Sequence, residues 1–496
     1  MALVINTNVS SLTSQRALHE SGSELSTAME RLSTGLKINA ASDDAAGLAM
    51  TQRMTAQVRG LSMAVKNAND GMAMTKSVEG AIGEVSDMLQ RMRELAIQAA
   101  NGTNSSADRT FLQNEVNLLI QEITRVSTNT RYNGELILDG TFINKNLQVG
   151  IEEGEVITMS VESIAAEKIG AHTLVGDGIQ ANAAAADPSA NPTRAVDTME
   201  IFGFLGTKLI TPGTADSAKN VAVLINNQTG VTGVKAYAKN YASLHSSHAN
   251  EKTYSVKING YSTGNFVISK GSTQNAVDAI NQISGATGVT AHSQSTASET
   301  RVVLFDSDGD DITVENTSTT TGNTDLVVQK IGETGQVADL VGAARTLAIG
   351  GGLDAVLVSG TLKMTSANAF SVTGGNNTGY MGDTAGTFTA ELKNLTEVNI
   401  STMLQAGDSI SIIDSSLNKI AQMRANLGAI ENRLDYTITN LMNIGERTAD
   451  SRSRLQDADY ALESSRLAKA QVIQQAGTQM LSQANQMTQL VLDLLR

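Results

Sequence analysis

The sequence predicts a mixed fold, in which both termini form a long α-helical coiled-coil core and a β-rich, α+β outer region is inserted between them. Near both ends, apolar residues repeat every seven positions, as coiled coils require. The three prolines, Pro188, Pro192 and Pro212, all lie in the middle, whereas 16 of the 19 arginines lie toward the two ends. Such a split in composition is typical of one domain that is built from both termini and carries an insertion.

The N-terminal part is predicted to contain three helices. Leu18, Leu25 and Leu32 lie seven residues apart and predict the first helix, which is followed by a loop over residues 35–44. Ser42 or Asp43 is expected to cap the next helix. Apolar residues at a spacing of three to four predict that this helix runs over residues 45–100, roughly 80 Å at the usual rise per residue. A shorter helix is predicted around residues 112–126.

The C-terminal part has the most regular pattern in the chain. Ile413, Ile420, Leu427, Leu434 and Leu441 are each seven residues apart. Heptads sustained over this length favour coiled-coil packing. An ordinary amphipathic helix on a globular core is the alternative.

The final stretch, residues 471–492, contains no charged residue and seven glutamines. Glutamine at this density is too costly in lipid for a membrane span. A helix with no charged outer face is expected to be buried on most sides, which requires other copies of the chain. Rods that meet through different faces form helical filaments when the contacts do not close. The apolar stripe predicted to take part consists of Ile473, Met480, Met487, Val491 and Leu494.

Composition excludes several classes of function. The net charge is −14, and residues 141–409 carry −11 of it. This charge argues against nucleic acid or an anionic membrane as a partner. The absence of cysteine excludes disulfides, thiolate catalysis and Cys-ligated zinc. The first residues lack the pattern of a cleavable secretion signal, so a secreted form would need a dedicated export route.

The middle of the chain predicts a small α+β module. Short apolar runs at residues 256–258 and 266–268 flank an Asn259-Gly260 turn and predict a hairpin. A helix is predicted at residues 273–283. Further strands are predicted at residues 302–305 and 312–314.

Two acidic clusters are candidate sites. Residues 306–311 (DSDGDD) resemble a calcium loop, but Asp311 and Thr317 stand where an EF-hand has Gly and Glu. A solvated turn is therefore favoured over a calcium site. Asp43 and Asp44 are interpreted as cap and loop residues rather than as catalytic carboxylates. No catalytic, cofactor-binding or metal-binding residue is predicted, and the chain is not expected to be an enzyme.

Motifs at both ends carry a family resemblance. The N-terminal ones are MALVINTNVSSLTSQRAL at the start, RLSTGLKINAASDDAAGLAM (Arg31–Met50) and QRMRELAIQAANGT (Gln90–Thr103). The C-terminal ones are RANLGAIENRL (Arg424–Leu434), SRLQDADYA (Ser453–Ala461) and QANQMTQLVLDLLR at the end. Together they resemble bacterial flagellin, the subunit of the flagellar filament.

The resemblance implies a structural subunit that polymerises into the extracellular filament used for swimming. It implies a filament-core helix and loop (1–44), a helical-bundle half with a β-hairpin (45–165), variable outer domains (166–409), the other bundle half (410–459) and a C-terminal core helix (460–496). The implied partners are other copies of the chain, an export chaperone at the C-terminus, and the flagellar cap and hook-associated proteins. Export would proceed through the flagellar type III apparatus. A hook–filament junction protein and a secreted adhesin remain as alternatives.

The resemblance also implies a patch recognised by the Toll-like flagellin receptor of hosts. The alternative reading is that these residues make subunit contacts, and both readings are compatible. The matching residues are Gln90, Arg91, Arg93, Glu94, Leu95 and Glu115.

Overall fold

The computed structural model describes residues 7–176, 198–213, 216–296, 299–318, 326–349, 354–374, 380 and 386–494, with side chains described as far as residue 486. The chain divides into two compact units. The first contains Met1–Ser77, Asn144–Ser160 and Leu427–Arg496, and the second contains Val78–Ile143 and Val161–Asn426. These units cut across the five segments predicted from the sequence, which remain a prediction about the assembled filament.

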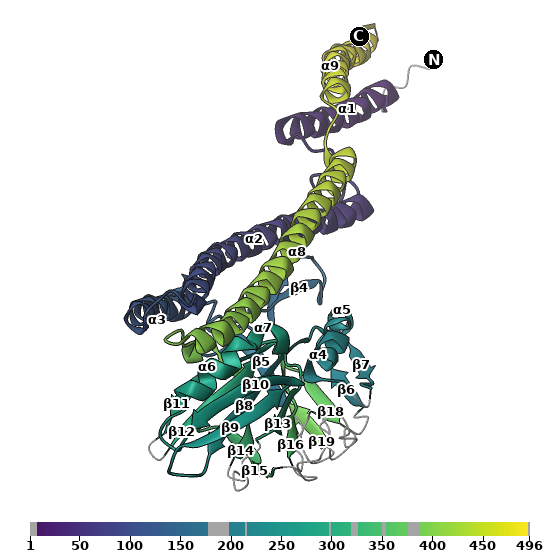
Figure 1. The fold of residues 1–496 in the computed structure, drawn as a ribbon. Helices are drawn as coiled ribbons and strands as arrows, with labels where there is room; N and C mark the ends of the chain where they lie inside the picture. The colour runs from purple at the N-terminus through teal and green to yellow at the C-terminus, as the bar shows by residue number, and fades with distance from the viewer. Residues whose placement is uncertain are drawn as a thin grey trace. The chain divides into compact units, whose positions relative to one another are not determined.

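Four long helices confirm the helical prediction for the ends. They are α1 (Val9–Thr34), α2 (Ala45–Ala100), α8 (Met403–Gln456) and α9 (Tyr460–Leu494). In the first unit α1 packs against α9 (Figure 1). The helix α1 begins at a capping Asn8 and ends at Gly35, whose φ of 73° lies in the left-handed region.

The predicted cap of α2 is wrong by one residue. Asp44 lies immediately before the helix, and its Oδ1 accepts the Gly47 N–H at 2.9 Å. Asp43 turns back instead, and its Oδ2 accepts the N–H groups of Asn39 and Ala40 at 3.0 and 2.9 Å. These hydrogen bonds lower the pKa of Asp43. The two carboxylates therefore hold the helix start and the loop before it.

A β-hairpin completes the core of the first unit. As predicted, strands β3 (Lys145–Gln148) and β4 (Val156–Met159) form this hairpin. Its Val149 and Ile157 join Ala68 of α2 and Leu434 of α8 in one buried cluster. A second cluster one heptad further along α8 contains Leu61, Ala64 and Leu441.

Helix α3 (Ser106–Asn129) belongs to the second unit and begins with a capping box. The Ser105 hydroxyl accepts the Asp108 N–H at 3.2 Å, and the Asp108 carboxylate accepts the Ser105 N–H at 3.0 Å. The small pair β1 (Arg131–Tyr132) and β2 (Glu135–Leu136) follows. Buried apolar residues of this unit's helical part include Val78, Ile82, Val85, Leu89, Met92, Ala96, Val116, Ile123, Ile413 and Ile420.

The rest of the second unit is rich in strands (Figure 1). An eight-stranded sheet has the order β11-β12-β8-β17-β5-β20, with β14 pairing with both β8 and β15. Its strands are β5 (Gly170–Gly176), β8 (Lys235–Ser246), β11 (Val289–Ser295), β12 (Thr300–Asp306), β14 (Leu326–Ile331), β15 (Leu340–Leu347), β17 (Thr361–Ser366) and β20 (Glu391–Asn394).

Two four-stranded sheets accompany it. One has the order β10-β9-β13-β16, with β9 (Lys252–Ile258), β10 (Tyr261–Ile268), β13 (Ile312–Asn316) and β16 (Ala355–Val358). The other has the order β19-β18-β6-β7, with β6 (Met199–Phe202), β7 (Thr207–Ile210), β18 (Ser371–Gly374) and β19 (Gly386–Thr389). Short helices α4 (Ala218–Asn226), α5 (Thr229–Thr232), α6 (Gln274–Gln282) and α7 (Ser284–Thr287) connect the strands, and a 3₁₀ turn covers Leu395–Glu397.

The predicted α+β module is confirmed. Strands β9 and β10 form a hairpin across Asn259 and Gly260, whose φ values are 49° and 85°. Two consecutive positive φ values are the mark of a type I′ turn. Helix α6 lies where a helix was predicted, and its Ala276, Val277 and Ile280 pack into a core with residues of β9, β12 and β13. No described helix combines the length and the apolar character that crossing a bilayer demands.

Candidate assembly surface

The contact between α1 and α9 is close because one position lacks a side chain. A Cβ built on Gly477 would lie 2.7 Å from Leu18 Cδ1, so glycine lets the two helices approach. Leu25 and Leu32 follow Leu18 at heptad spacing, and all three are half-buried. The predicted N-terminal stripe therefore faces α9 at Leu18.

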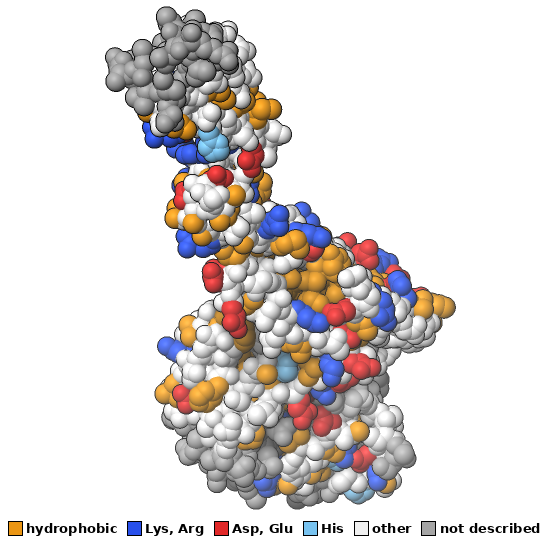
Figure 2. All heavy atoms as spheres, turned by 180° about the vertical axis from the view of Figure 1, so that it is seen from behind, with side chains coloured by type: hydrophobic (Ala, Val, Ile, Leu, Met, Phe, Trp, Pro, Cys, Tyr) orange, Lys and Arg blue, Asp and Glu red, His pale blue; other side chains and the backbone are white. Residues whose placement is uncertain are grey.

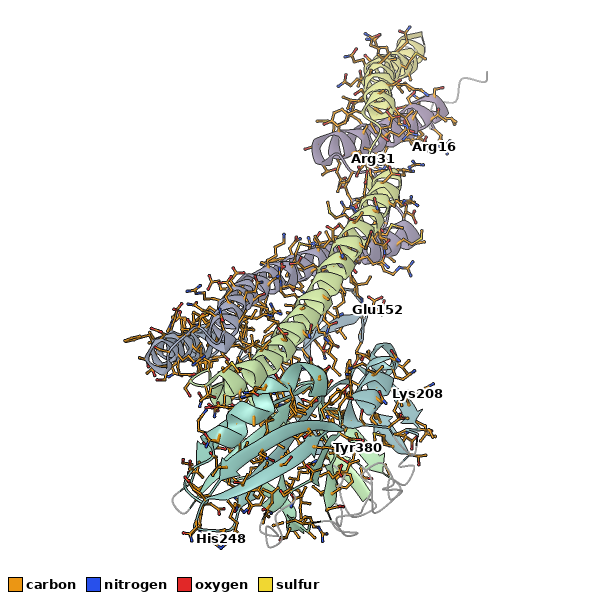
Figure 3. All side chains as sticks on the ribbon, viewed as in Figure 1. Arg16, Arg31, Glu152, Lys208, His248 and Tyr380 are labelled. Carbon is orange, nitrogen blue, oxygen red and sulfur yellow. The ribbon has the colours of Figure 1, made fainter. Side chains whose placement is uncertain are left out.

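A salt bridge fixes the pairing of these helices. Arg31 of α1 (labelled in Figure 3) lies 3.2 Å from the Glu463 carboxylate of α9, measured from Nη1 to Oε1. Glu463 also accepts a hydrogen bond from Arg466 at 2.8 Å. The Glu463 side chain is only 5% exposed, so its charge depends on these two partners.

Backbone acceptors on each helix receive side chains from the other. Three hydrogen bonds of 2.8–3.1 Å do so: Ser21 Oγ to Ala470 O, Asn8 Nδ2 to Ala484 O and Tyr460 Oη to Leu32 O. They set the register of α1 against α9 without contributing apolar burial.

Several large apolar side chains of this pair are exposed. Among the described side chains of α1 and α9, the buried apolar ones are only Ala28 and Ala470. Ile473 is 40% exposed and Met480 is 64% exposed, although both belong to the predicted stripe. The other exposed large apolar residues among the described side chains of the two helices are Val9, Leu12, Met29, Tyr460, Leu462 and Val472. The side chains of Met487, Val491 and Leu494 lie outside the described residues.

The C-terminal heptad leucines have a different environment. Leu427, Leu434 and Leu441 are 3%, 0% and 7% exposed. They were predicted to belong to the polymerisation core, and in the structure they are buried within the chain itself. They are therefore unavailable to contact a second copy of this conformation.

The predicted receptor patch lies on α2 and α3 in the second unit. Arg91 Nε lies 2.9 Å from Glu115 Oε1, and Arg91 Nη1 lies 3.0 Å from Glu94 Oε2. These hydrogen bonds, Glu115 first, raise the pKa of Arg91. Arg93 pairs with Asp414 of α8 at 2.6 Å. Gln90 is exposed beside them.

Leu95 does not belong to this surface. It is 1% exposed and lies on the inner face of α2. Its placement among surface residues was wrong, because it falls on the same helical stripe as the buried Met92 and Ala99.

Exposed apolar residues of α3 were missed by the sequence analysis. Phe111 is 72% exposed and Leu118 is 65% exposed. They lie seven residues apart and off the buried stripe of Val116 and Ile123. The sequence does contain a signal for them, because Phe111 and Leu118 are large apolar residues that lie outside the buried stripe of α3.

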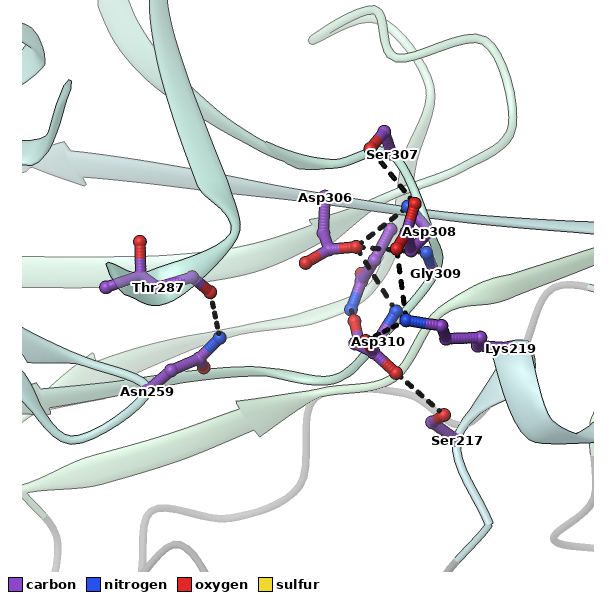
Figure 4. A network of polar contacts seen from close by, with 10 residues as sticks. Ser217, Lys219, Asn259, Thr287, Asp306, Ser307, Asp308, Gly309 and Asp310 are labelled. Atoms are coloured by element: carbon purple, nitrogen blue, oxygen red, sulfur yellow. Dashed lines mark hydrogen bonds and ion pairs between the residues drawn. The ribbon is translucent and has the colours of Figure 1, made fainter. Parts of the chain in front are cut away.

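Lys219 of α4 pairs with two carboxylates of the acidic turn after β12 (Figure 4). Lys219 of α4 places its Nζ 3.0 Å from Asp308 and 2.8 Å from Asp310. The pKa of Lys219 is raised by these carboxylates. Asp306 Oδ1 accepts the N–H groups of the next residues at 3.0–3.3 Å. The turn thus holds an ammonium group, and within the described part of the chain no three His or carboxylate residues gather to hold a metal.

Basic and acidic side chains are interspersed on the face shown in Figure 2. Nucleic-acid-binding proteins usually present a basic patch or stripe.

Comparisons with known proteins agree at both ends and over the full length. The family described as the bacterial flagellin N-terminal helical region matches residues 5–143, and the bacterial flagellin C-terminal helical region matches residues 410–495. A B-type flagellin of Pseudomonas aeruginosa is 35% identical over 509 residues, covering 100% of both chains. A flagellin of Salmonella muenchen is 34% identical over 534 residues, also covering 100% of both.

A solved structure of FliC from Burkholderia pseudomallei shares 20% identity over 73% of this chain and 99% of that chain, with a TM-score of 0.28. This superposition is too weak to support an argument. The full-length relatives favour a filament subunit over a junction protein. The chain therefore belongs to the bacterial flagellins, a structural protein family, and it is a subunit of the extracellular flagellar filament that drives swimming.

Proposed function

We propose that the chain polymerises through the exposed apolar side chains of the α1–α9 pair. The single observation that carries this proposal is the exposure of Ile473 and Met480 on a helix that has no charged residue from 471 to 492. Burial of a Leu- or Met-sized side chain is worth about 1.5–3 kcal/mol. A second copy of the chain supplies the missing cover, because a homopolymer always has copies of itself next to it. Met487, Val491 and Leu494 are proposed to continue the same surface.

Removal of residues 460–496 tests this proposal. The truncated chain should remain soluble, keep its β-rich region folded and fail to assemble onto short filament seeds. Electron microscopy and sedimentation measure the assembly, and far-ultraviolet circular dichroism checks the fold. Filaments grown from the truncated chain would refute the proposal.

The same exposed surface supports the proposed partners in export and at the filament ends. An exposed apolar stripe needs cover before assembly, which supports an export chaperone bound to the C-terminal helix. The absence of cysteine suits passage as an unfolded chain through a type III apparatus, since no disulfide can form on the way. Flagellar cap and hook-associated proteins are the proposed partners at the ends of the filament.

We also propose recognition of the α2–α3 patch by the Toll-like receptor of hosts. The charged residues Arg91, Arg93, Glu94 and Glu115 carry it together with Gln90. Because Leu95 is buried, its substitution would act through packing and would not test a contact.

The sharper test is therefore Arg91→Ala alone, since Arg91 is 49% exposed and its ion pairs lie at the surface. Receptor signalling by the monomer should fall about tenfold or more, as for an interface hot spot, while the melting temperature stays unchanged. Arg125→Ala on α3, which removes an exposed pair with Glu122 in the same way, is the matched control. Equal signalling by both variants would reject the patch.

A further inference from the structure

A cavity of about 210 Å³ lies in the second unit, between the start of α8 and one face of the eight-stranded sheet. The register of β8 and β17 pairs Tyr237 with Lys363 and Lys239 with Thr361. Alternate residues of a strand share a face, so these four side chains lie together on the cavity wall. Residues 407–414 of α8 provide the opposite wall.

Each charged group that lines the cavity already has an oppositely charged partner, and that of Asp414 is Arg93 of α2. Lys239 Nζ lies 2.9 Å from Asp408 Oδ1, and Lys363 Nζ lies 3.6 Å from the same oxygen and also pairs with Glu333. Burial alone would lower the pKa of Lys363, but Glu333 and Asp408 outweigh it and raise the pKa. A charged ligand would have to compete with these pairs. The cavity therefore favours a neutral ligand.

One buried polar atom in the wall has no partner. Thr361 is 3% exposed, and its Oγ1 has no hydrogen bond within the described residues. An unsatisfied buried hydroxyl costs about 1–3 kcal/mol and calls for an explanation. A ligand hydroxyl group would satisfy it.

An exposed glycine forms part of the cavity lining. Gly407 lies inside α8, and a Cβ built on it meets no atom within 4 Å. Glycine within a helix costs about 1 kcal/mol relative to alanine. This cost has no backbone reason, since Gly407 does not have a positive φ.

We propose that this cavity binds a neutral monosaccharide ring. Its volume is below the roughly 300–1,000 Å³ of sites for drug-sized ligands, which suits a single ring. The half-exposed Tyr237 offers an apolar ring face to the C–H face of a sugar. Carboxylates, ammonium groups and the Thr361 hydroxyl offer acceptors and donors to the sugar hydroxyls. Because α8 forms one wall, residues 166–409 alone do not contain the whole site.

The test uses the full monomeric chain with D-galactose, D-mannose and N-acetyl-D-glucosamine as neutral probes, and D-glucosamine and D-glucuronate as charged ones. Saturation-transfer NMR and calorimetry should detect saturable binding of at least one neutral sugar. Failure of all three neutral sugars, or tighter binding of a charged probe, would overturn the proposal.

Two substitutions locate the binding. Gly407→Leu should abolish it by filling the cavity, whereas Gly428→Leu, at another open glycine of α8, should leave it unchanged. Thr361→Val should weaken binding about fivefold through one lost hydrogen bond, with no loss of melting temperature in the free protein. Binding that survives Gly407→Leu, or a Thr361→Val variant that is less stable but binds normally, would count against the site.

Discussion

Two stretches of C-terminal helix share one sequence period and differ in what covers them. In α8, Leu427, Leu434 and Leu441 are at most 7% exposed, because α2 and the β3–β4 hairpin pack on parts of this stripe. In α9, Ile473 and Met480 also lie seven apart but are at least 40% exposed, because α1 is the one described element that packs extensively on this helix. A heptad pattern thus predicts that a stripe is to be buried, and the number of neighbouring elements decides whether the chain can bury it alone.

The largest expected difference between the two stripes is in the stability of the monomer. Leu434→Ala should lower the free energy of unfolding by about 2–5 kcal/mol, because it leaves a cavity at a fully buried position. Met480→Ala should change it by about 0.5 kcal/mol or less, as exposed substitutions do. Urea unfolding of the two monomers measures both values, and equal losses would break the comparison.

Filament assembly should be more sensitive to substitution at Met480 than at Leu434. Met480→Glu should raise the concentration needed for seeded filament growth about a hundredfold, because a carboxylate would be buried without a partner. Leu434→Met keeps volume and apolar character, so it should assemble nearly as the parent does. Light scattering with short seeds gives the critical concentration. Normal growth of the Met480→Glu variant would show that this face stays in solvent.

A smaller effect on stability is expected from removing the ion pairs of Glu463, which join α1 and α9. Glu463→Gln keeps the shape of the side chain but removes the charge that Arg31 and Arg466 share. A charge-assisted hydrogen bond contributes roughly 1.5–3 kcal/mol to stability. The neutral amide of glutamine should keep part of this contribution. Faster hydrogen exchange should follow in α1 and α9 while the amides of α8 stay protected. Asp450→Asn, which removes an exposed ion pair with Arg454, is the control. It should leave hydrogen exchange in α1 and α9 unchanged.

The sequence predicted local elements better than it predicted their partners. Helix α2 and the Asn259-Gly260 hairpin follow from residues close together in the chain, as do caps, although Asp44 took the place expected for Asp43. The pairing of β8 with β12, β14 and β17 joins segments separated by dozens of residues, which no periodicity encodes. The pairing of Lys219, on a distant helix, with Asp308 and Asp310 was not predicted for the same reason.

Lowering the pH should destabilise the eight-stranded sheet and leave the stability of both helical stripes unchanged. His245 of β8 is 6% exposed, and burial, with Arg301 and Lys270 nearby and only Glu299 opposing, lowers its pKa to about 4. The unfolded chain therefore binds the proton more tightly, near the ordinary pKa of about 6.5. Stability is thus fully present above that value and falls as the pH drops toward 4.

The loss between pH 7 and pH 5.5 should be about 1 kcal/mol in the β-rich region, visible as lower amide protection factors in β8 once the slower intrinsic exchange at the lower pH is taken into account. His245→Gln should abolish this part of the pH dependence, and His248→Gln, in the loop after β8, should retain it. Neither helical stripe contains a histidine, so the protection of α8 and α9 should not change over the same interval. If α9 loosened together with β8, the two regions would be coupled in the monomer, and the exposed stripe could not be treated as independent of the sheet.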